Sequence, residues 1–288
     1  MGVRTANPGA DRVLDRLRFG WREAERIWLL PVSEPLDARI ASSGWKPVAL
    51  EKCCDRCGQP VGAGEKIDDE MGCASCRGVA LPWDRFVHLG LYVGELAEWV
   101  QEVKFTRNHW LGRQLGAELG RAIARSRALG AEGVAAAQGK GARAPAVAPI
   151  ASPYWRRVLR GIDHAGAIAA GAAAELGLEL VRPLHKSHRR TQRGLSPTAR
   201  EENMRGAFRL RRPIDWNGRT VIVIDDVCTT GATMRAACRA IRAGRKRGSE
   251  GGPGMIVAAA LALTPGHARR GEVPAGASEG PRGVDSGV

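Results

Sequence analysis

The chain of 288 residues is 44% hydrophobic and 5% aromatic, and 44 Lys and Arg residues outnumber 30 Asp and Glu residues. This length suffices for one domain of about 200 residues and a small module. The net charge of +14 favours anionic partners such as nucleic acid or phosphorylated metabolites. No apolar segment follows the charged N-terminus, and no stretch approaches the roughly 18 apolar residues of a membrane span. We therefore expect a cytoplasmic protein without a secretory signal or a membrane span.

Two parts of the first half of the chain are predicted to be helical. Residues 11–30 carry apolar side chains at roughly helical spacing. Residues 94–128 repeat apolar side chains at three- and four-residue steps, with a break near Asn108. Residues 130–143 have low complexity, which indicates a flexible connection.

Strands and helices alternate in the second half of the chain. The expected strands are residues 144–150, 178–184, 219–226 and 254–263, and the expected helices are about 163–176 and 232–246. This alternation predicts an α/β fold with a parallel sheet. Residues 266–288 contain almost no apolar side chains, so we expect a disordered tail.

Four cysteines follow the C-x₂-C-x₁₅-C-x₂-C spacing of a structural zinc site, and they are Cys54, Cys57, Cys73 and Cys76. A two-residue gap lets both thiolates of a turn face one ion, and four such ligands leave no open position for catalysis. Cys53 is an alternative to Cys54, because a three-residue gap to Cys57 also works. Four buried free cysteines are the other interpretation.

The stretch VIVIDDVCTTGAT, residues 221–233, places a β-branched run before Asp225 and Asp226 and then a threonine-rich turn. Ligands of a parallel sheet bind beyond the carboxyl ends of its strands, where we expect the two acids. Backbone N–H groups at the next helix start and the close approach allowed by Gly231 suit a phosphate. Carboxylates suit sugar hydroxyls or hydrated Mg²⁺. A ribose 5-phosphate satisfies both requirements.

A polar strand-to-helix connection whose threonines merely cap the helix is the alternative interpretation of this stretch. Under that alternative, two adjacent acids after an apolar strand have no packing reason. The sequence contains no G-x-x-x-x-G-K-[ST] loop and no G-x-G-x-x-G after a strand. Nucleoside triphosphate and dinucleotide sites of those two kinds are therefore set aside.

The same stretch resembles the phosphoribosyl pyrophosphate signature of type I phosphoribosyltransferases. The segments CDRCG…CASC, LGLYVGELAEWVQEVKFTRNHWLGRQLG, APIASPYWRRVLRGIDHA and RRTQRGLSPTAREENMRGAF occur in that order. Together they make the chain similar to the ComF family, which is associated with DNA uptake and competence. The resemblance covers about residues 50–265 and implies a type I phosphoribosyltransferase-like parallel sheet flanked by helices, preceded by a small four-cysteine zinc ribbon.

This resemblance also suggests how the chain is divided. We expect a helical extension over residues 1–50, a zinc ribbon over 51–82, a phosphoribosyltransferase-like domain over 83–265 and a disordered tail over 266–288. The oligomeric state is left open by the sequence.

By position, the resemblance implies that Asp225 and Asp226 are the catalytic pair, which would hold the ribose hydroxyls directly or through Mg²⁺. The turn that would bind the 5-phosphate consists of Thr229, Thr230, Gly231, Ala232 and Thr233. Residues 151–157 would form the pyrophosphate loop, and residues 186–205 a mobile loop over the site. The basic side chains of that loop, which would neutralise departing pyrophosphate or solvate an exposed loop, are Lys186, Arg189, Arg190 and Arg193.

The main functional hypothesis is a protein that binds phosphoribosyl pyrophosphate with Mg²⁺ and transfers phosphoribosyl to an unknown nitrogen acceptor, in association with DNA uptake. A non-catalytic scaffold that handles single-stranded DNA or binds competence proteins is the second hypothesis, because ligand sensing and turnover need the same contacts. A nucleobase-salvage phosphoribosyltransferase is the third. The zinc would be structural in all three.

Overall fold

The computed structural model describes residues 34–48, 50–62, 65, 67, 72–106, 108–129, 144–151, 163–186, 206–244 and 251–264. It separates the chain into two compact units, Met1–Ser42 and Ser43–Val288. The predicted helix 11–30, the connection 130–143 and the tail 266–288 lie outside the described residues. The structure contains two short helices that were not predicted individually, α2 (Leu36–Ser43), which falls within the expected helical extension, and the 3₁₀ helix η1 (Leu50–Lys52).

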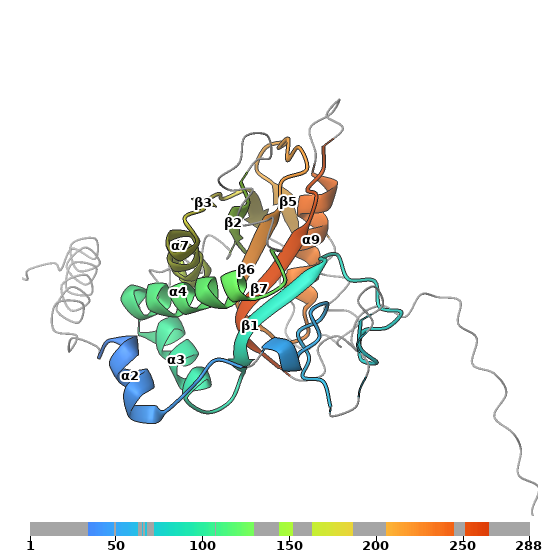
Figure 1. The fold of residues 1–288 in the computed structure, drawn as a ribbon. Coiled ribbons are helices and arrows are strands. Elements are labelled where there is room, and N and C mark those ends of the chain that lie inside the picture. Colours follow the sequence, from blue (N-terminus) through green and yellow to red (C-terminus); the bar gives the residue numbers. More distant parts are fainter. Residues whose placement is uncertain are drawn as a thin grey trace, which may run out of the picture. The chain divides into compact units, whose positions relative to one another are not determined.

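The predicted parallel sheet is confirmed, and its order is β1-β7-β6-β2-β3 with every neighbouring pair parallel (Figure 1). Its strands are β1 (Arg85–Leu91), β2 (Ala146–Pro149), β3 (Glu179–Leu180), β6 (Val221–Cys228) and β7 (Ile256–Leu263). All eight residues of β7 are buried, as expected for an inner strand with both faces covered. β1 was not predicted, and it occupies one edge of the sheet.

Helices cover both faces of this sheet. Figure 1 places α4 and α7 on one side of the sheet and α9 on the other. The helices are α3 (Gly94–Phe105), α4 (His109–Arg125), α7 (His164–Leu176) and α9 (Ala232–Ala243). The predicted break near Asn108 is confirmed, because the Asn108 side chain accepts a hydrogen bond from the Leu111 N–H at 2.9 Å and thereby caps α4.

Glycines allow α4 and α7 to pack with their backbones in close contact. A Cβ atom on Gly116 of α4 would overlap the carbonyl oxygen of Ile168 in α7, and one on Gly171 of α7 would overlap the carbonyl oxygen of Arg113. These positions therefore require the absence of a side chain. Within this pair, α7 packs against β2 and β6, and α4 packs against β1 and β7, so the two helices together cover one face of the sheet that carries the candidate site.

The predicted strand 178–184 is wrong in extent, because it divides between two sheets. β3 ends at Leu180, and β4 (Leu184–Lys186) pairs antiparallel with β5 (Phe208–Leu210) in a separate two-stranded sheet. Pro183 lies between the two strands and has no N–H group with which to continue a ladder. The second sheet brings Lys186, at the end of β4, toward the candidate site.

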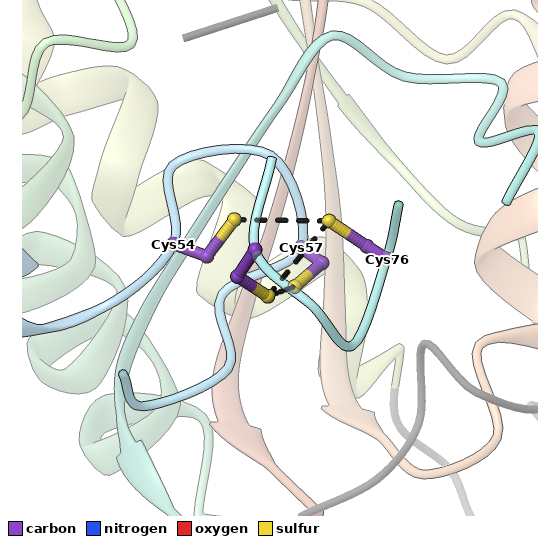
Figure 2. A group of neighbouring side chains, drawn as sticks. Cys54, Cys57 and Cys76 are labelled. Atoms are coloured by element: carbon purple, nitrogen blue, oxygen red, sulfur yellow. Dashed lines mark hydrogen bonds between the residues drawn. The ribbon is translucent and has the colours of Figure 1, made fainter. Parts of the chain in front are cut away.

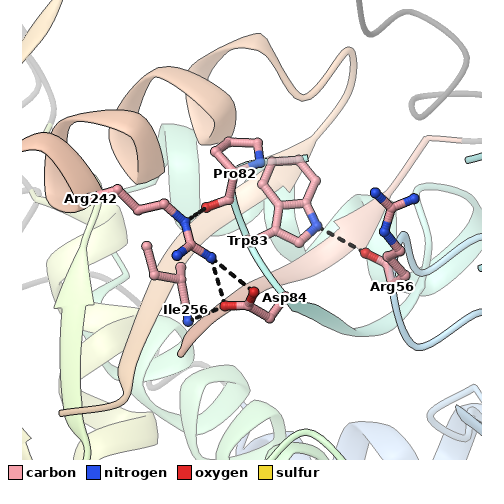
Figure 3. Close-up of polar contacts among 6 residues, drawn as sticks. All are labelled: Arg56, Pro82, Trp83, Asp84, Arg242 and Ile256. Carbon is pink, nitrogen blue, oxygen red and sulfur yellow. Dashed lines mark hydrogen bonds and ion pairs between the residues drawn. The ribbon is translucent and has the colours of Figure 1, made fainter. Parts of the chain in front are cut away.

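The segment that precedes β1 ties three parts of the main unit together (Figure 3). The Asp84 carboxylate accepts two hydrogen bonds from Arg242 of α9, at 2.8 and 2.9 Å, and one from the Ile256 N–H of β7 at 2.7 Å. The buried Trp83 indole donates to the carbonyl oxygen of Arg56 in the cysteine module at 3.0 Å. The module is thus attached to the sheet by direct hydrogen bonds.

Candidate functional site

Four buried cysteines converge on one point, as the spacing predicted. The sulfur atoms of Cys54, Cys57, Cys73 and Cys76 all lie within 4.8 Å of one another. Three of the separations are 3.6, 3.8 and 3.9 Å. A tetrahedral ion with Zn–S bonds of about 2.3 Å requires sulfur separations of about 3.8 Å. Figure 2 shows the labelled thiols pointing toward one another. The four cysteines are positioned to bind a metal ion, and their geometry fits structural zinc.

The backbone turns around the cysteines explain why Cys54, and not Cys53, belongs to this group. The Gly58 N–H donates to the Cys54 carbonyl oxygen at 2.7 Å, which closes the first turn. Cys53 instead forms a backbone bridge with Pro60, and its sulfur is not part of the group of four. Gly72 has φ of +78°, and a Cβ atom there would overlap the Cys76 sulfur, so only glycine fits beside the second turn.

A buried histidine joins the cysteine module to the first strand. The Nε2 atom of His88 in β1 lies 2.7 Å from the Gly58 carbonyl oxygen. Burial lowers the pKa of His88, against the opposing effect of hydrogen bonds to the carbonyl groups of Gly58 and Gly90. The Nδ1 atom lies 3.1 Å from the Gly90 carbonyl oxygen, so both ring nitrogens face carbonyl groups. The Phe86 N–H adds a backbone bond of 2.8 Å to the Asp55 carbonyl oxygen.

The acid pair lies within β6 and not beyond its end, which corrects the expected position. Asp225 and Asp226 are both partly buried, and the strand continues to Cys228. The Asp225 carboxylate accepts from the Asp226 N–H at 2.9 Å, and the Asp226 carboxylate accepts from the Val227 N–H at 2.6 Å. Pairing with β7 continues to Leu263, so the ladder extends past the acids on that side and fixes their backbone.

The environment of Asp225 disfavours the ionised form of its carboxyl group. Desolvation, followed by repulsion from Asp226, raises the pKa of Asp225 to about 7, although the positive charges of Lys104 and Lys186 act in the opposite direction. A carboxyl group that titrates near neutral pH is a common feature of functional sites. A bound cation would relieve this repulsion.

Two lysines from separate elements reach the acid pair. The Lys104 ammonium of α3 lies 3.3 Å from the Asp226 carboxylate and 5.8 Å from the centre of the Tyr92 ring. Lys186 of β4 is close enough to lower the pKa of Asp225. Lys186 was expected as part of a mobile loop, but sequence reasoning missed Lys104, since a lysine in the last turn of an amphipathic helix ordinarily indicates a solvated face.

The turn after β6 leads directly into α9, and no side chain caps that helix. Gly231 is the N-cap residue, with φ of +73°. The nearest approach to a cap is a bond of 3.4 Å from the Ala232 N–H to the Thr230 hydroxyl. The structure therefore does not support the alternative in which the threonines only cap the helix. Buried Arg235 donates to the Thr230 carbonyl oxygen at 2.9 Å and brings a positive charge beneath the turn.

The structure brings the acid pair and the whole threonine turn together at one edge of the sheet. Of the expected pyrophosphate loop only Ala151 is described, and of the expected mobile loop only Lys186 is described. The remaining residues of both loops lie outside the described residues, including Arg189, Arg190 and Arg193.

The fold and this edge of the sheet agree with comparison to known families. Residues 151–267 match the family described as "Phosphoribosyl transferase domain". The chain thus contains a phosphoribosyltransferase-type domain, and that match includes the acid pair, the threonine turn and α9.

Two similar proteins show the family to which the chain belongs. The chain is 27% identical over 59% of its length to "Competence protein F" of Haemophilus influenzae and covers 72% of that protein. It is 30% identical over 63% of its length to "DNA utilization protein YhgH" of Salmonella typhi and covers 74% of it. The chain belongs to the ComF family. Within the described part of the chain, no helix has the length and apolar character needed to cross a bilayer.

Proposed function

We propose that this ComF-family chain binds phosphoribosyl pyrophosphate together with Mg²⁺ at the carboxyl edge of its parallel sheet. One observation carries the proposal: the partly buried pair of Asp225 and Asp226 leads into a helix whose N-cap is Gly231 and which has no side-chain cap. Such a helix start offers backbone N–H groups and a positive dipole end to a phosphate. The adjacent acids offer ligands for a hydrated cation or for ribose hydroxyls.

Each charged group in the site has a role in this proposal. Asp225 and Asp226 hold the ribose hydroxyls directly or through Mg²⁺, and the turn from Thr229 to Thr233 holds the 5-phosphate. Lys104 and Lys186 lie at the acid pair and balance its negative charge. Transfer to a nitrogen acceptor would displace pyrophosphate from C1 of the ribose, with the protein supplying position and charge stabilisation.

A role in DNA use is favoured by the names of the relatives, which refer to competence and to DNA utilization. The net charge of +14 is compatible with binding of nucleic acid. A scaffold that binds phosphoribosyl pyrophosphate as a signal and handles single-stranded DNA is therefore the second candidate. A nucleobase-salvage enzyme is the third, and it predicts pyrophosphate release with one free base and none without it.

Calorimetric titration of the zinc-loaded protein with phosphoribosyl pyrophosphate, with and without Mg²⁺, tests the proposal. We expect Mg²⁺-dependent binding that is abolished in the Asp225→Asn/Asp226→Asn variant and retained in Asp37→Asn, which changes an exposed acid of α2. Unaltered binding in the double variant would refute the site. Absence of binding to the folded wild-type protein would refute the proposal that phosphoribosyl pyrophosphate is the ligand.

A further inference from the structure

A cavity lies beside β3 and the segment that leads into β6, and none of its lining residues belongs to the acid pair or the threonine turn. Its volume is about 730 Å³, and it lies between the segments 179–183 and 211–216, with Arg219 completing the wall. Val221 and Glu179 both pair with Ala146, so the Glu179 end of the cavity is level with the first residues of these strands. Extended chain from Arg219 to Asp225 spans roughly 20 Å, so the end of the cavity at Arg219 is distant from the acid pair.

Positive charge dominates the wall of the cavity. Four guanidinium groups line it, and they belong to Arg182, Arg211, Arg212 and Arg219. Two carboxylates, those of Glu179 and Asp215, lie in the same wall. Arg219 is held by Glu179 at 2.8 Å, and Arg182 is held by Asp163 at 2.5 Å. Arg212 is exposed, and it has no ion-pair partner among the described residues. Its guanidinium is available to an anion.

A buried donor in the same wall lacks an acceptor. Trp216 is 2% exposed, and its indole Nε1 has no hydrogen-bond partner among the described residues. Trp216 is among the residues that line the cavity, so its indole N–H is a reporter close to any ligand bound there.

The rest of the wall is apolar and suits a flat ring. Leu180, Val181, Pro213 and Ile214 line the cavity beside the charged groups. A volume of this size is typical of sites for small organic ligands, which combine apolar walls with a few polar groups. Guanidinium groups recognise phosphate oxygens through paired N–H donors.

We propose that this cavity binds a nucleotide unit, with its phosphate at Arg211 and Arg212 and its base against the apolar wall. The shared chemistry is a phosphate ester on a heteroaromatic ring, and its source is either a free nucleotide or a single-stranded nucleic acid. Its lining residues are distinct from the acid pair and the threonine turn, so it stands independently of the proposed function.

The test follows the indole resonance of Trp216 by NMR in ¹⁵N-labelled, zinc-loaded protein. The protein carries the substitutions Asp225→Asn and Asp226→Asn, which disable the proposed phosphoribosyl pyrophosphate site. Loss of the resonance in Trp216→Phe assigns it. The two probes are adenosine 5′-monophosphate and a short oligothymidylate. We expect saturable movement of the Trp216 resonance with at least one probe, and the responding probe identifies the source.

Arg212→Gln should weaken this binding about tenfold, because the loss of one charge-assisted hydrogen bond lowers an affinity by about that factor. Arg125→Gln, which changes an exposed arginine of α4 outside the cavity, is the matched control and should bind like its parent. No movement of the Trp216 resonance with either probe at millimolar concentration would overturn the proposal. Equal weakening in Arg212→Gln and Arg125→Gln would also overturn it, since it would indicate non-specific charge attraction.

Discussion

The ammonium group of Lys104 lies 3.3 Å from the carboxylate of Asp226, although one belongs to α3 and the other to β6. Their side chains are only 21% and 22% exposed, so their attraction is weakened less by water than that of a surface pair. In the protein without a ligand, Lys104 therefore balances charge at the position where a cation would approach the acid pair. This contact links the helix after the first strand to the centre of the candidate site.

Lys104→Met should strengthen Mg²⁺ binding in the absence of other ligands by about threefold to tenfold, because a competing positive charge is removed. Calorimetric titration with magnesium chloride measures this change. Lys46→Met removes an exposed lysine elsewhere and should leave the affinity unchanged. Weaker Mg²⁺ binding in Lys104→Met would mean that the lysine supports the cation site and does not compete with it.

Asp225→Asn should stabilise the ligand-free protein at pH 8. The folded-state pKa of Asp225 is raised to about 7, above its usual value of 3.8, mainly by desolvation and then by Asp226. Between these values the folded state binds more protons than the unfolded state, so stability falls as pH rises through this window. Above pH 7 the full cost of ionisation is present, and asparagine removes it.

The expected gain at pH 8 is about 1 to 2 kcal/mol, and it should shrink toward pH 5, where the wild-type Asp225 is already protonated. Urea unfolding of both proteins at the two pH values, in buffer without Mg²⁺, measures the difference. Comparison at the same pH cancels any effect of acid on the thiols. A gain that grew toward pH 5 would contradict the raised pKa.

Cys54→Ser should lose bound zinc, whereas Cys53→Ser should keep one equivalent, because only the first removes a member of the group of four. Metal analysis of the purified proteins measures the stoichiometry. We expect the melting temperature to fall in Cys54→Ser, since a structural zinc site contributes folding free energy. If Cys53→Ser lost zinc and Cys54→Ser kept it, the zinc ligand of the first turn would be Cys53 and not Cys54.

Sequence patterns predicted the sheet where burial on both faces produces continuous apolar runs, as in β6 and β7. They missed β1, because RFVHLGL contains a histidine at its centre. That residue, His88, can be buried only because carbonyl groups of Gly58 and Gly90 lie beside its ring. Those carbonyls come from the folded structure, so periodicity could not reveal the strand.

The residues of the candidate site also fall into a group that the sequence predicted and a group that it missed. Asp225, Asp226 and the threonine turn are adjacent in sequence, and therefore a local motif predicted them. Lys104 and Arg235 reach the same site from helices, where arginine and lysine usually indicate a solvated surface. Only the packing of α3 and α9 turns these two charges toward the site, and that packing depends on long-range contacts which a single sequence does not reveal.

Two glycines of α4 should respond oppositely to alanine. A Cβ atom at Gly116 would overlap the Ile168 carbonyl oxygen, whereas one at Gly112 would lie 3.4 Å from the nearest side-chain carbons of Ala167 and Val103. Gly116→Ala must therefore force the backbones of α4 and α7 apart, at a cost of about 3 kcal/mol or more. Gly112→Ala fits without displacement and adds helix propensity, so we expect unchanged stability or a gain of up to about 1 kcal/mol. Urea unfolding of the two variants measures both effects, and equal destabilisation by both would refute the close backbone contact between α4 and α7.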